Sequence, residues 1–317
     1  MKKYLNDASN KILLYICISI VILIGSVYWN KINTETDLKF GFVTDFEYGY
    51  KNNIGNKLPK EAPNALEKAV TFFNEEFNPE VVIMGGDMVE SSLSKKKTTI
   101  EQFEKINAIF SKLEARRGYV FGNHDLRDLN KEELRGIFAM EDNHSYIDLG
   151  DWRFVLMDTN FKTDGSDLGP NMYVEGFVSE AEFEWLKVAL DTDRPTILVS
   201  HHSSIPDELD ENFISNTKNM FNGLEMHNFL KGYKNLVLMA SGHEPGFRFE
   251  NVDGIQYLIN GNLATIEVLS NFTSMEATYN KFTKEAKIEF EKHGENAGKY
   301  EVNKKIGEIK WMDLWKK

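Results

Sequence analysis

The chain has 317 residues, with 49 acidic and 37 basic side chains, and its formal net charge of −12 argues against a stable nucleic-acid partner, which would need a basic surface. Its single cysteine, Cys17, excludes an intramolecular disulfide. The length allows one large hydrophobic core or two modest ones, and an aromatic content of 12% is that of a folded chain rather than a disordered one.

An uncharged apolar stretch lies near the N-terminus, at residues 12–29. Three lysines precede it and a tryptophan ends it, and its 18 residues are close to the minimum for a helix that crosses a bilayer. This pattern predicts a single-pass membrane protein with the lipid bilayer as a partner and an extracytoplasmic domain. The predicted segments are a cytoplasmic N-terminus at 1–11, a transmembrane signal-anchor helix at 12–29 and a linker at 30–37. A cleaved signal peptide is the alternative.

From residue 38 onward, apolar runs of strand length alternate with segments whose apolar residues recur at helical spacing, which is typical of an α/β fold. Strands are expected at 38–44, 81–84, 119–121, 196–200 and 236–240, and helices at 64–77, 98–113, 130–138, 179–190 and 223–230. Hairpins are expected at 146–157 and 247–259, and further strands at 275–279 and 287–291. Two segments lack periodicity and are expected to be loops, one at 161–176 and a candidate lid at 203–222.

Five of the expected strands end in a side chain that can bind a metal or exchange a proton. These side chains are Asp45, Asp87, the pair Asn123-His124, His201 and His243. A single Asp or His in such a place is most often a turn former or an ordinary surface residue. Because ligands bind beyond the carboxyl ends of strands in α/β sheets, the recurrence predicts one shared site. Carboxylate, amide and imidazole groups together suit a divalent transition metal.

In order and spacing, the same residues resemble the motifs of the calcineurin-like metallophosphoesterases. The motifs are Asp45 with Glu47, Gly86-Asp87, Gly122-Asn123-His124-Asp125, His201 and Gly242-His243. The resemblance implies an α/β fold of the four-layer α/β/β/α sandwich type over 38–300, followed by a C-terminal tail at 301–317. Residues 40–45, 158–161 and 164–165 resemble the branch of manganese-dependent ADP-ribose/CDP-alcohol diphosphatases.

The resemblance also implies one or two divalent metal ions, manganese or iron and zinc, and hydrolysis of a phosphodiester or a pyrophosphate-linked small molecule by a metal-bound hydroxide. The implied metal ligands are Asp45, Glu47, Asp87, Asn123, His201 and His243, with Asp87 bridging the two ions. The implied catalytic residues are His124, as the general acid, and Asp45, which orients it. The implied contacts with a small phosphorylated substrate are His202, Arg127, Asp158 and Asn160.

Two positions depart from the family's pattern, and both belong to the same metal site. Glu47 stands where the family has the histidine of an Asp-x-His motif, and Pro245 stands where it has the second histidine of Gly-His-x-His. Glutamate supplies oxygen to a harder ion such as manganese, whereas the proline side chain cannot ligate. Three outcomes follow: a rearranged two-metal enzyme, a one-metal enzyme, or a non-catalytic module that binds a phosphorylated ligand. The retained His124 favours an enzyme.

Overall fold

The computed structural model describes residues 11–26, 35–91, 96–206 and 220–308, and within them the strands form two six-stranded sheets. The first sheet has the order β12-β11-β10-β1-β2-β3 and comprises β1 (Glu35–Val43), β2 (Val81–Met84), β3 (Arg116–Tyr119), β10 (Phe272–Asn280), β11 (Glu285–His293) and β12 (Gly298–Lys305). The second has the order β4-β5-β6-β7-β9-β8 and comprises β4 (Ser145–Leu149), β5 (Trp152–Leu156), β6 (Thr196–Ser200), β7 (Leu236–Ser241), β8 (Arg248–Val252) and β9 (Ile255–Ile259).

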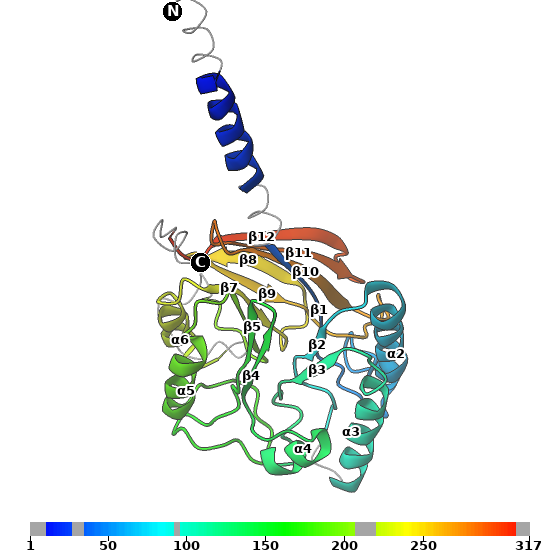
Figure 1. Cartoon of the computed structure of the whole chain (residues 1–317). Helices are drawn as coiled ribbons and strands as arrows, with labels where there is room; N and C mark the ends of the chain where they lie inside the picture. The colour runs from blue at the N-terminus through cyan, green and yellow to red at the C-terminus, as the bar shows by residue number, and fades with distance from the viewer. Residues whose placement is uncertain (1–10, 27–34, 92–95, 207–219, 309–317) are drawn as a thin grey trace, which may run out of the picture.

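Helices flank the pair of sheets on opposite sides (Figure 1). On the side of the first sheet lie α2 (Ala62–Phe72), with the short turns η1 (Pro59–Glu61) before it and η2 (Phe73–Phe77) after it, and α3 (Lys96–Phe110). On the side of the second sheet lie α5 (Glu180–Leu190) and α6 (Gly223–Leu230). The short helix α4 (Lys131–Phe138) follows the β3 loop and lies at the end of the molecule away from β12 (Figure 1).

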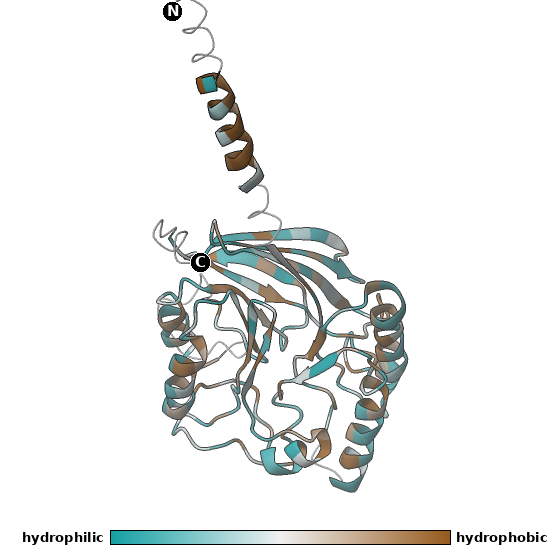
Figure 2. Cartoon of the chain, in the orientation of Figure 1, coloured by the Kyte–Doolittle hydropathy of each residue, from teal (hydrophilic) through white to brown (hydrophobic). Residues whose placement is uncertain are grey.

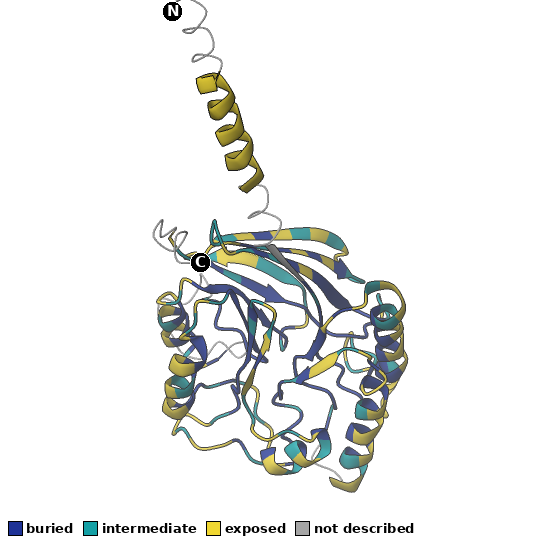
Figure 3. Ribbon diagram, viewed as in Figure 1, coloured by how far each residue is buried: buried dark blue, intermediate teal, exposed yellow. Residues whose placement is uncertain are grey.

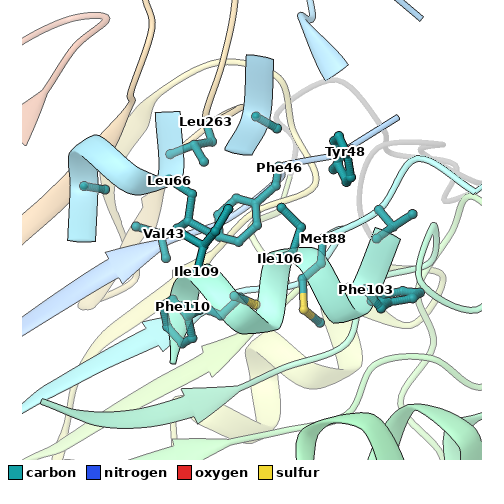
Figure 4. Packing of buried hydrophobic residues seen from close by; sticks show 14 of the residues in the cluster. Val43, Phe46, Tyr48, Leu66, Met88, Phe103, Ile106, Ile109, Phe110 and Leu263 are labelled. Carbon is teal, nitrogen blue, oxygen red and sulfur yellow. The ribbon is translucent and has the colours of Figure 1, made fainter. Parts of the chain in front are cut away.

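Three hydrophobic clusters hold these layers together. The middle cluster joins the inner faces of the two sheets, where the rings of Phe40 and Phe154 meet at 5.0 Å between centroids. A second cluster joins the first sheet to α2 and α3, with Leu66 and Ile106 among its buried members (Figure 4). The third joins the second sheet to α5 and α6. The central strands are accordingly buried, whereas the helices are exposed on their outer sides (Figure 3). The expected mixed α/β arrangement with two sheets is confirmed.

The sequence signals for two helix starts are confirmed by their caps. Asn130 caps α4 in a capping box, because its side chain accepts from the N–H of Glu133 at 2.9 Å while the Glu133 carboxylate accepts from the N–H of Asn130 at 3.1 Å. The Ser179 hydroxyl accepts from the N–H of Glu182 at 3.2 Å and caps α5. By contrast, α3 already includes Lys96, two residues before the predicted start.

The predicted N-terminal membrane anchor is wrong. Residues 11–26 are helical and largely apolar (Figure 2), but within the described residues no helix is both long and apolar enough to cross a membrane. The transmembrane signal-anchor helix at 12–29, the single-pass extracytoplasmic placement and the bilayer as a partner are therefore all corrected.

The topology places the ends of the predicted strands at one edge. Strands β1, β2 and β3 are parallel, and so are β5, β6, β7 and β9. Their carboxyl ends therefore face the same way within each sheet, as a shared site requires. At the other extreme of the first sheet, β12 continues through Lys305, past the expected domain boundary at residue 300. Of the candidate lid at 203–222, residues 207–219 lie outside the described part of the chain.

Candidate metal centre

The loops after β1, β2, β6 and β7 bring together the side chains that the sequence singled out. One ligand atom from each of Asp45, Asp87 and His201 lies within 4.8 Å of the other two, and so does one nitrogen from each of His201, His202 and His243. Backbone hydrogen bonds join these loops: Asp45 N–H donates to Gly86 O at 3.0 Å, and Gly242 N–H donates to His201 O at 3.0 Å. The two sheets thus contribute to a single cluster.

The backbone at this cluster adopts conformations that ordinary residues avoid. Asp45, Asp87 and His243 have φ of 54°, 51° and 68°, in the left-handed region, which costs each residue about 1 kcal/mol or more. Two glycines allow the close approach: a Cβ at Gly122 would lie 2.1 Å from Asp87 Oδ1, and one at Gly242 would lie 2.2 Å from Asp45 Oδ2. Strain that the surrounding fold maintains in this way is concentrated at functional sites.

His201 presents one ring nitrogen to the centre of the cluster. Its Nδ1 lies 2.9 Å from Gly85 O and donates to it, which leaves Nε2 facing Asp87 Oδ2 at 3.3 Å. This Nε2 is buried, and apart from this contact with Asp87 it makes no well-aligned hydrogen bond among the described residues. Burial lowers the pKa of His201, but the Asp87 carboxylate outweighs it and raises the pKa to about 10. His201 and Asp87 therefore form a place where positive charge is strongly favoured.

Asn123 and His243 complete the same side of the cluster. The Asn123 amide donates from Nδ2 to Tyr173 O at 2.8 Å, so its Oδ1 faces the cluster, 3.2 Å from His243 Nδ1. Burial alone would raise the pKa of Asp87, but His201 and His124 hold it well below its usual range. The ionised Asp87 carboxylate, the Asn123 amide oxygen and the imidazoles of His201 and His243 together fit one divalent transition-metal ion.

The side of the cluster that contains Asp45 and Glu47 has a different set of side chains. The Asp45 carboxylate accepts from the N–H of His243 at 3.1 Å and 3.0 Å and from the Thr44 hydroxyl at 2.7 Å. Glu47 is buried, has φ of 44°, and forms an ion pair with Lys57 through Oε1. Glu244 does not replace the missing histidine, because its carboxylate pairs with Arg248 Nη1 at 3.3 Å. This half therefore presents carboxylates and the Lys57 ammonium, and its imidazole is that of His124, which has a nitrogen within 4.8 Å of carboxylate oxygens of Glu47 and Glu90.

His124 lies beside both Asp87 and a carboxylate that the sequence analysis did not single out. Its N–H donates to Asp87 Oδ1 at 2.8 Å, and its Nδ1 lies 3.3 Å from Glu90 Oε2. Its Nε2 lies 2.6 Å from Arg127 Nη2 and 3.8 Å from Asp87 Oδ2. Burial lowers the pKa of His124, but Asp87 and Glu90 more than offset this, and the pKa lies above its usual value. Glu90 is therefore a carboxylate that faces the ring, and the expected role of Asp45 in orienting His124 stays a prediction.

Of the four expected substrate contacts, Arg127 and His202 lie at the cluster. Arg127 lies at the site, where its Nη1 donates to Glu90 O at 3.0 Å. His202 is fully buried, with Nδ1 2.8 Å from the Thr159 hydroxyl and Nε2 3.2 Å from Val174 O. Burial and the neighbouring His243 hold its pKa well below the usual range, so it is neutral. His202 therefore positions the loop at 161–176 beside the cluster.

Asp158 and Asn160 have partners away from the cluster. Asp158 forms an ion pair with the buried Lys131 at 2.6 Å, and the Asn160 amide donates to Phe121 O at 2.6 Å. Their described contacts fix the start of the loop at 161–176 against the β3 loop. Their role in substrate binding therefore stays a prediction.

Three residues of the site were missed by the sequence analysis as site residues: Asp125, Glu90 and Lys57. Asp125 is buried, and its carboxylate accepts from the backbone N–H groups of the two loops that carry Asp87 and Asn123. Its place two residues after Asn123 was a usable signal. Glu90 and Lys57 lie in irregular segments, where composition offers no signal.

Comparisons with known proteins agree with this arrangement. The family model of the calcineurin-like phosphoesterases matches residues 38–247. No curated protein sequence matches the chain. Among solved structures, a dimetal phosphatase from Danio rerio aligns with a TM-score of 0.66 at 13% identity, covering 85% of this chain and 99% of that one. The anchor protein GAP50 of the Plasmodium inner membrane complex aligns with a TM-score of 0.53 at 13% identity, covering 85% and 89%.

At these identities the solved structures establish the fold alone, whereas the family model spans well over half of the chain. Family membership, together with the clustered ligands, settles the broad activity. The chain belongs to the calcineurin-like phosphoesterase family and is a metal-dependent phosphoric ester hydrolase.

Proposed function

We propose that this hydrolase cleaves a phosphodiester or a pyrophosphate-linked small molecule, using manganese held by Asp87, Asn123, His201 and His243. The observation that carries the proposal is the buried His201 Nε2, which lies 3.3 Å from the ionised Asp87 carboxylate and makes no well-aligned hydrogen bond among the described residues. An imidazole nitrogen and a carboxylate that converge in this way are suited to ligate the same divalent ion. A bound divalent ion would neutralise charge on the transferring phosphoryl group and lower the pKa of a water molecule.

The chain's own residues supply the proton and the orientation. The pKa of His124 lies above its usual value, which favours the charged ring that would donate a proton to the leaving oxygen. Glu90 Oε2 lies 3.3 Å from His124 Nδ1 and stabilises the positively charged ring. Arg127 fixes the Glu90 segment by donating a hydrogen bond to the backbone carbonyl oxygen of Glu90. The Arg127 guanidinium adds positive charge where the phosphoryl oxygens accumulate negative charge.

Substrate choice is proposed to lie in the loop at 161–176. Tyr173 O receives the Asn123 amide at 2.8 Å, and Val174 O lies 3.2 Å from His202 Nε2, so the loop ends against the metal position. The resemblance to ADP-ribose/CDP-alcohol diphosphatases rests on residues 40–45 and on residues 158–161 and 164–165 at the start of this loop. These features support a pyrophosphate-linked nucleoside as the first substrate to test.

The test compares substrates on the purified full chain with added Mn²⁺. ADP-ribose, bis(p-nitrophenyl) phosphate and p-nitrophenyl phosphate are assayed with wild type, with His201→Ala and with His293→Gln, whose imidazole contacts Ser274 Oγ outside the site. Turnover of the first two substrates above that of the monoester, abolished by His201→Ala and retained by His293→Gln, is expected. Tight binding of ADP-ribose with no turnover above the His201→Ala background would instead favour the non-catalytic phospholigand-binding alternative.

A further inference from the structure

Lys57 occupies a position that a surface lysine would not. Its side chain is 28% exposed, and its ammonium pairs with Glu47 Oε1, whose own side chain is only 3% exposed. The electrostatic partners of Lys57 are Glu47, Asp87 and Asp45, the three carboxylates of the cluster. Burial lowers the pKa of Lys57, but these carboxylates outweigh it and raise the pKa above its usual value, so the side chain is a cation at all physiological pH values.

The backbone holds Lys57 in this place. Its N–H donates to Ile54 O at 3.0 Å, and its carbonyl accepts from the N–H of Ile54 at 3.1 Å, which closes a tight turn. A β-bridge joins Lys57 to Thr265, and Leu58 N–H donates to Ala264 O at 3.0 Å. The ammonium therefore sits on an anchored segment rather than at the tip of a free loop.

The carboxylates on this side already face cations of the chain. The family's two histidines are replaced by Glu47 and Pro245, and the nearby Glu244 pairs with Arg248. Glu47, Glu90 and His124 lie close enough together to hold a metal ion, but Glu47 pairs with Lys57, and Glu90 lies against His124 and Arg127. One divalent ion at His201 and one ammonium at Lys57 together carry three positive charges, and Asp45, Glu47 and Asp87 carry at most three negative charges. A second divalent ion beside Lys57 would leave the buried cluster with excess positive charge, which is costly in a low-dielectric site.

From this geometry we propose that the Lys57 ammonium takes the place of the second metal ion, so that the site holds one divalent cation and one cation supplied by the chain. This inference rests on the proposed function for the identity of the first ion. Lysine is a compact point charge with three donors, and it lies next to the carboxylates that would otherwise bind metal. In the reaction it would stabilise negative charge on the phosphoryl oxygens that face Glu47 and Asp45.

The experiment measures metal content rather than rate. Full-length chain is stripped with a chelator and loaded with Mn²⁺, and bound metal is counted by elemental analysis and by calorimetric titration. Electron paramagnetic resonance then distinguishes isolated Mn²⁺ from an exchange-coupled pair. Wild type is expected to bind one ion with an isolated spectrum. Lys57→Met, which keeps an aliphatic side chain without the ammonium, is expected to bind a second ion. The control is Lys60→Met, because Lys60 is exposed in η1.

Two coupled ions in wild type, or a Lys57→Met chain that still binds only one, would overturn the proposal. Two coupled ions in wild type would overturn the proposal even if Lys57→Met fails to fold. A chain that binds one ion, gains a second in Lys57→Met, and hydrolyses none of the tested substrates would contradict the proposed function alone. Conversely, full turnover with two coupled ions in wild type would contradict the assignment of Lys57 alone.

Discussion

Asp125 Oδ2 accepts a hydrogen bond from the backbone N–H of Asp87 at 3.0 Å. The same carboxylate accepts from the N–H groups of Met88 at 2.7 Å and Gly122 at 2.9 Å. Asp125 thus ties the turn that carries one metal-ligand candidate to the turn that carries another, Asn123. Burial and the neighbouring Asp87 raise its pKa to about 7. Removing an acceptor oxygen of Asp125 should therefore disturb the metal ligands Asp87 and Asn123, although Asp125 itself is not one of the proposed ligands.

We expect Asp125→Asn to weaken Mn²⁺ binding by about 10- to 100-fold, the usual cost of losing a group that orients metal ligands. The amide has one acceptor oxygen where the carboxylate has two, so at least one backbone N–H loses its partner. Calorimetric titration measures the affinity. Asp128→Asn is the matched control, because Asp128 contacts the Thr99 hydroxyl instead. Equal affinities in the two variants would show that Asp125 does not position the metal site.

His124→Gln is expected to lower kcat by about 10²- to 10⁴-fold for a substrate with an alkoxide leaving group, because the proton donor is lost. The loss should be much smaller for a p-nitrophenyl leaving group, which departs without protonation. Bound Mn²⁺ per chain should not change. A similar loss for both leaving groups would rule out His124 as the general acid.

The pH dependence follows from the same residue. The pKa of His124 lies above its usual value because Asp87 and Glu90 favour the charged ring. The protonated form is the acid, so turnover of the alkoxide substrate should stay high past pH 6.5 and fall as the pH rises through the raised pKa. In His124→Gln this alkaline decline should disappear, and its persistence would assign it to another group.

Lys292 provides a test of the fold away from the site. Its side chain is buried in β11, and burial lowers its pKa to about 7. Between that value and its unfolded pKa, the unfolded chain binds more protons than the folded one. Stability should therefore rise with pH above 7 and fall as the pH drops towards 7, by at most about 1.4 kcal/mol per pH unit.

Urea unfolding of wild type and Lys292→Met at several pH values between 7 and 10 measures this slope. The variant loses the hydrogen bonds from Lys292 Nζ to His293 O, 2.9 Å long, and to Asn271 Oδ1. This loss shifts its stability by a constant amount, so the difference in slope is the informative quantity. Lys299→Met is the control, because its side chain is 83% exposed. Parallel slopes for wild type and Lys292→Met would contradict a depressed pKa.

The ligand cluster was predictable because it depends on topology that short patterns reveal. Apolar runs at 81–84, 196–200 and 236–240 became β2, β6 and β7, and the polar residue after each one lies at the shared edge of its sheet. Parallel strands in α/β folds make this inference general. The metal roles of these residues remain predictions until an ion is located.

Other features depend on contacts that the sequence does not reveal. Lys57 lies in an irregular segment, and only the folded chain places its ammonium beside Glu47. Strand β12 was missed because Val302 is its only buried residue, so it lacks an apolar alternation. The apolar run at 12–29 gave the wrong prediction because hydropathy measures composition alone, and no helix in the described part of the chain is both long and apolar enough to cross a membrane.

The most direct test of the central claim is anomalous diffraction from crystals of the full chain grown with Mn²⁺. The account predicts an anomalous peak at His201 Nε2, with Asp87, Asn123 and His243 as the other protein ligands. It predicts no second peak beside Glu47, whose carboxylate pairs with the Lys57 ammonium. A chain without a peak at His201, or with manganese bound only at other side chains, would contradict the account.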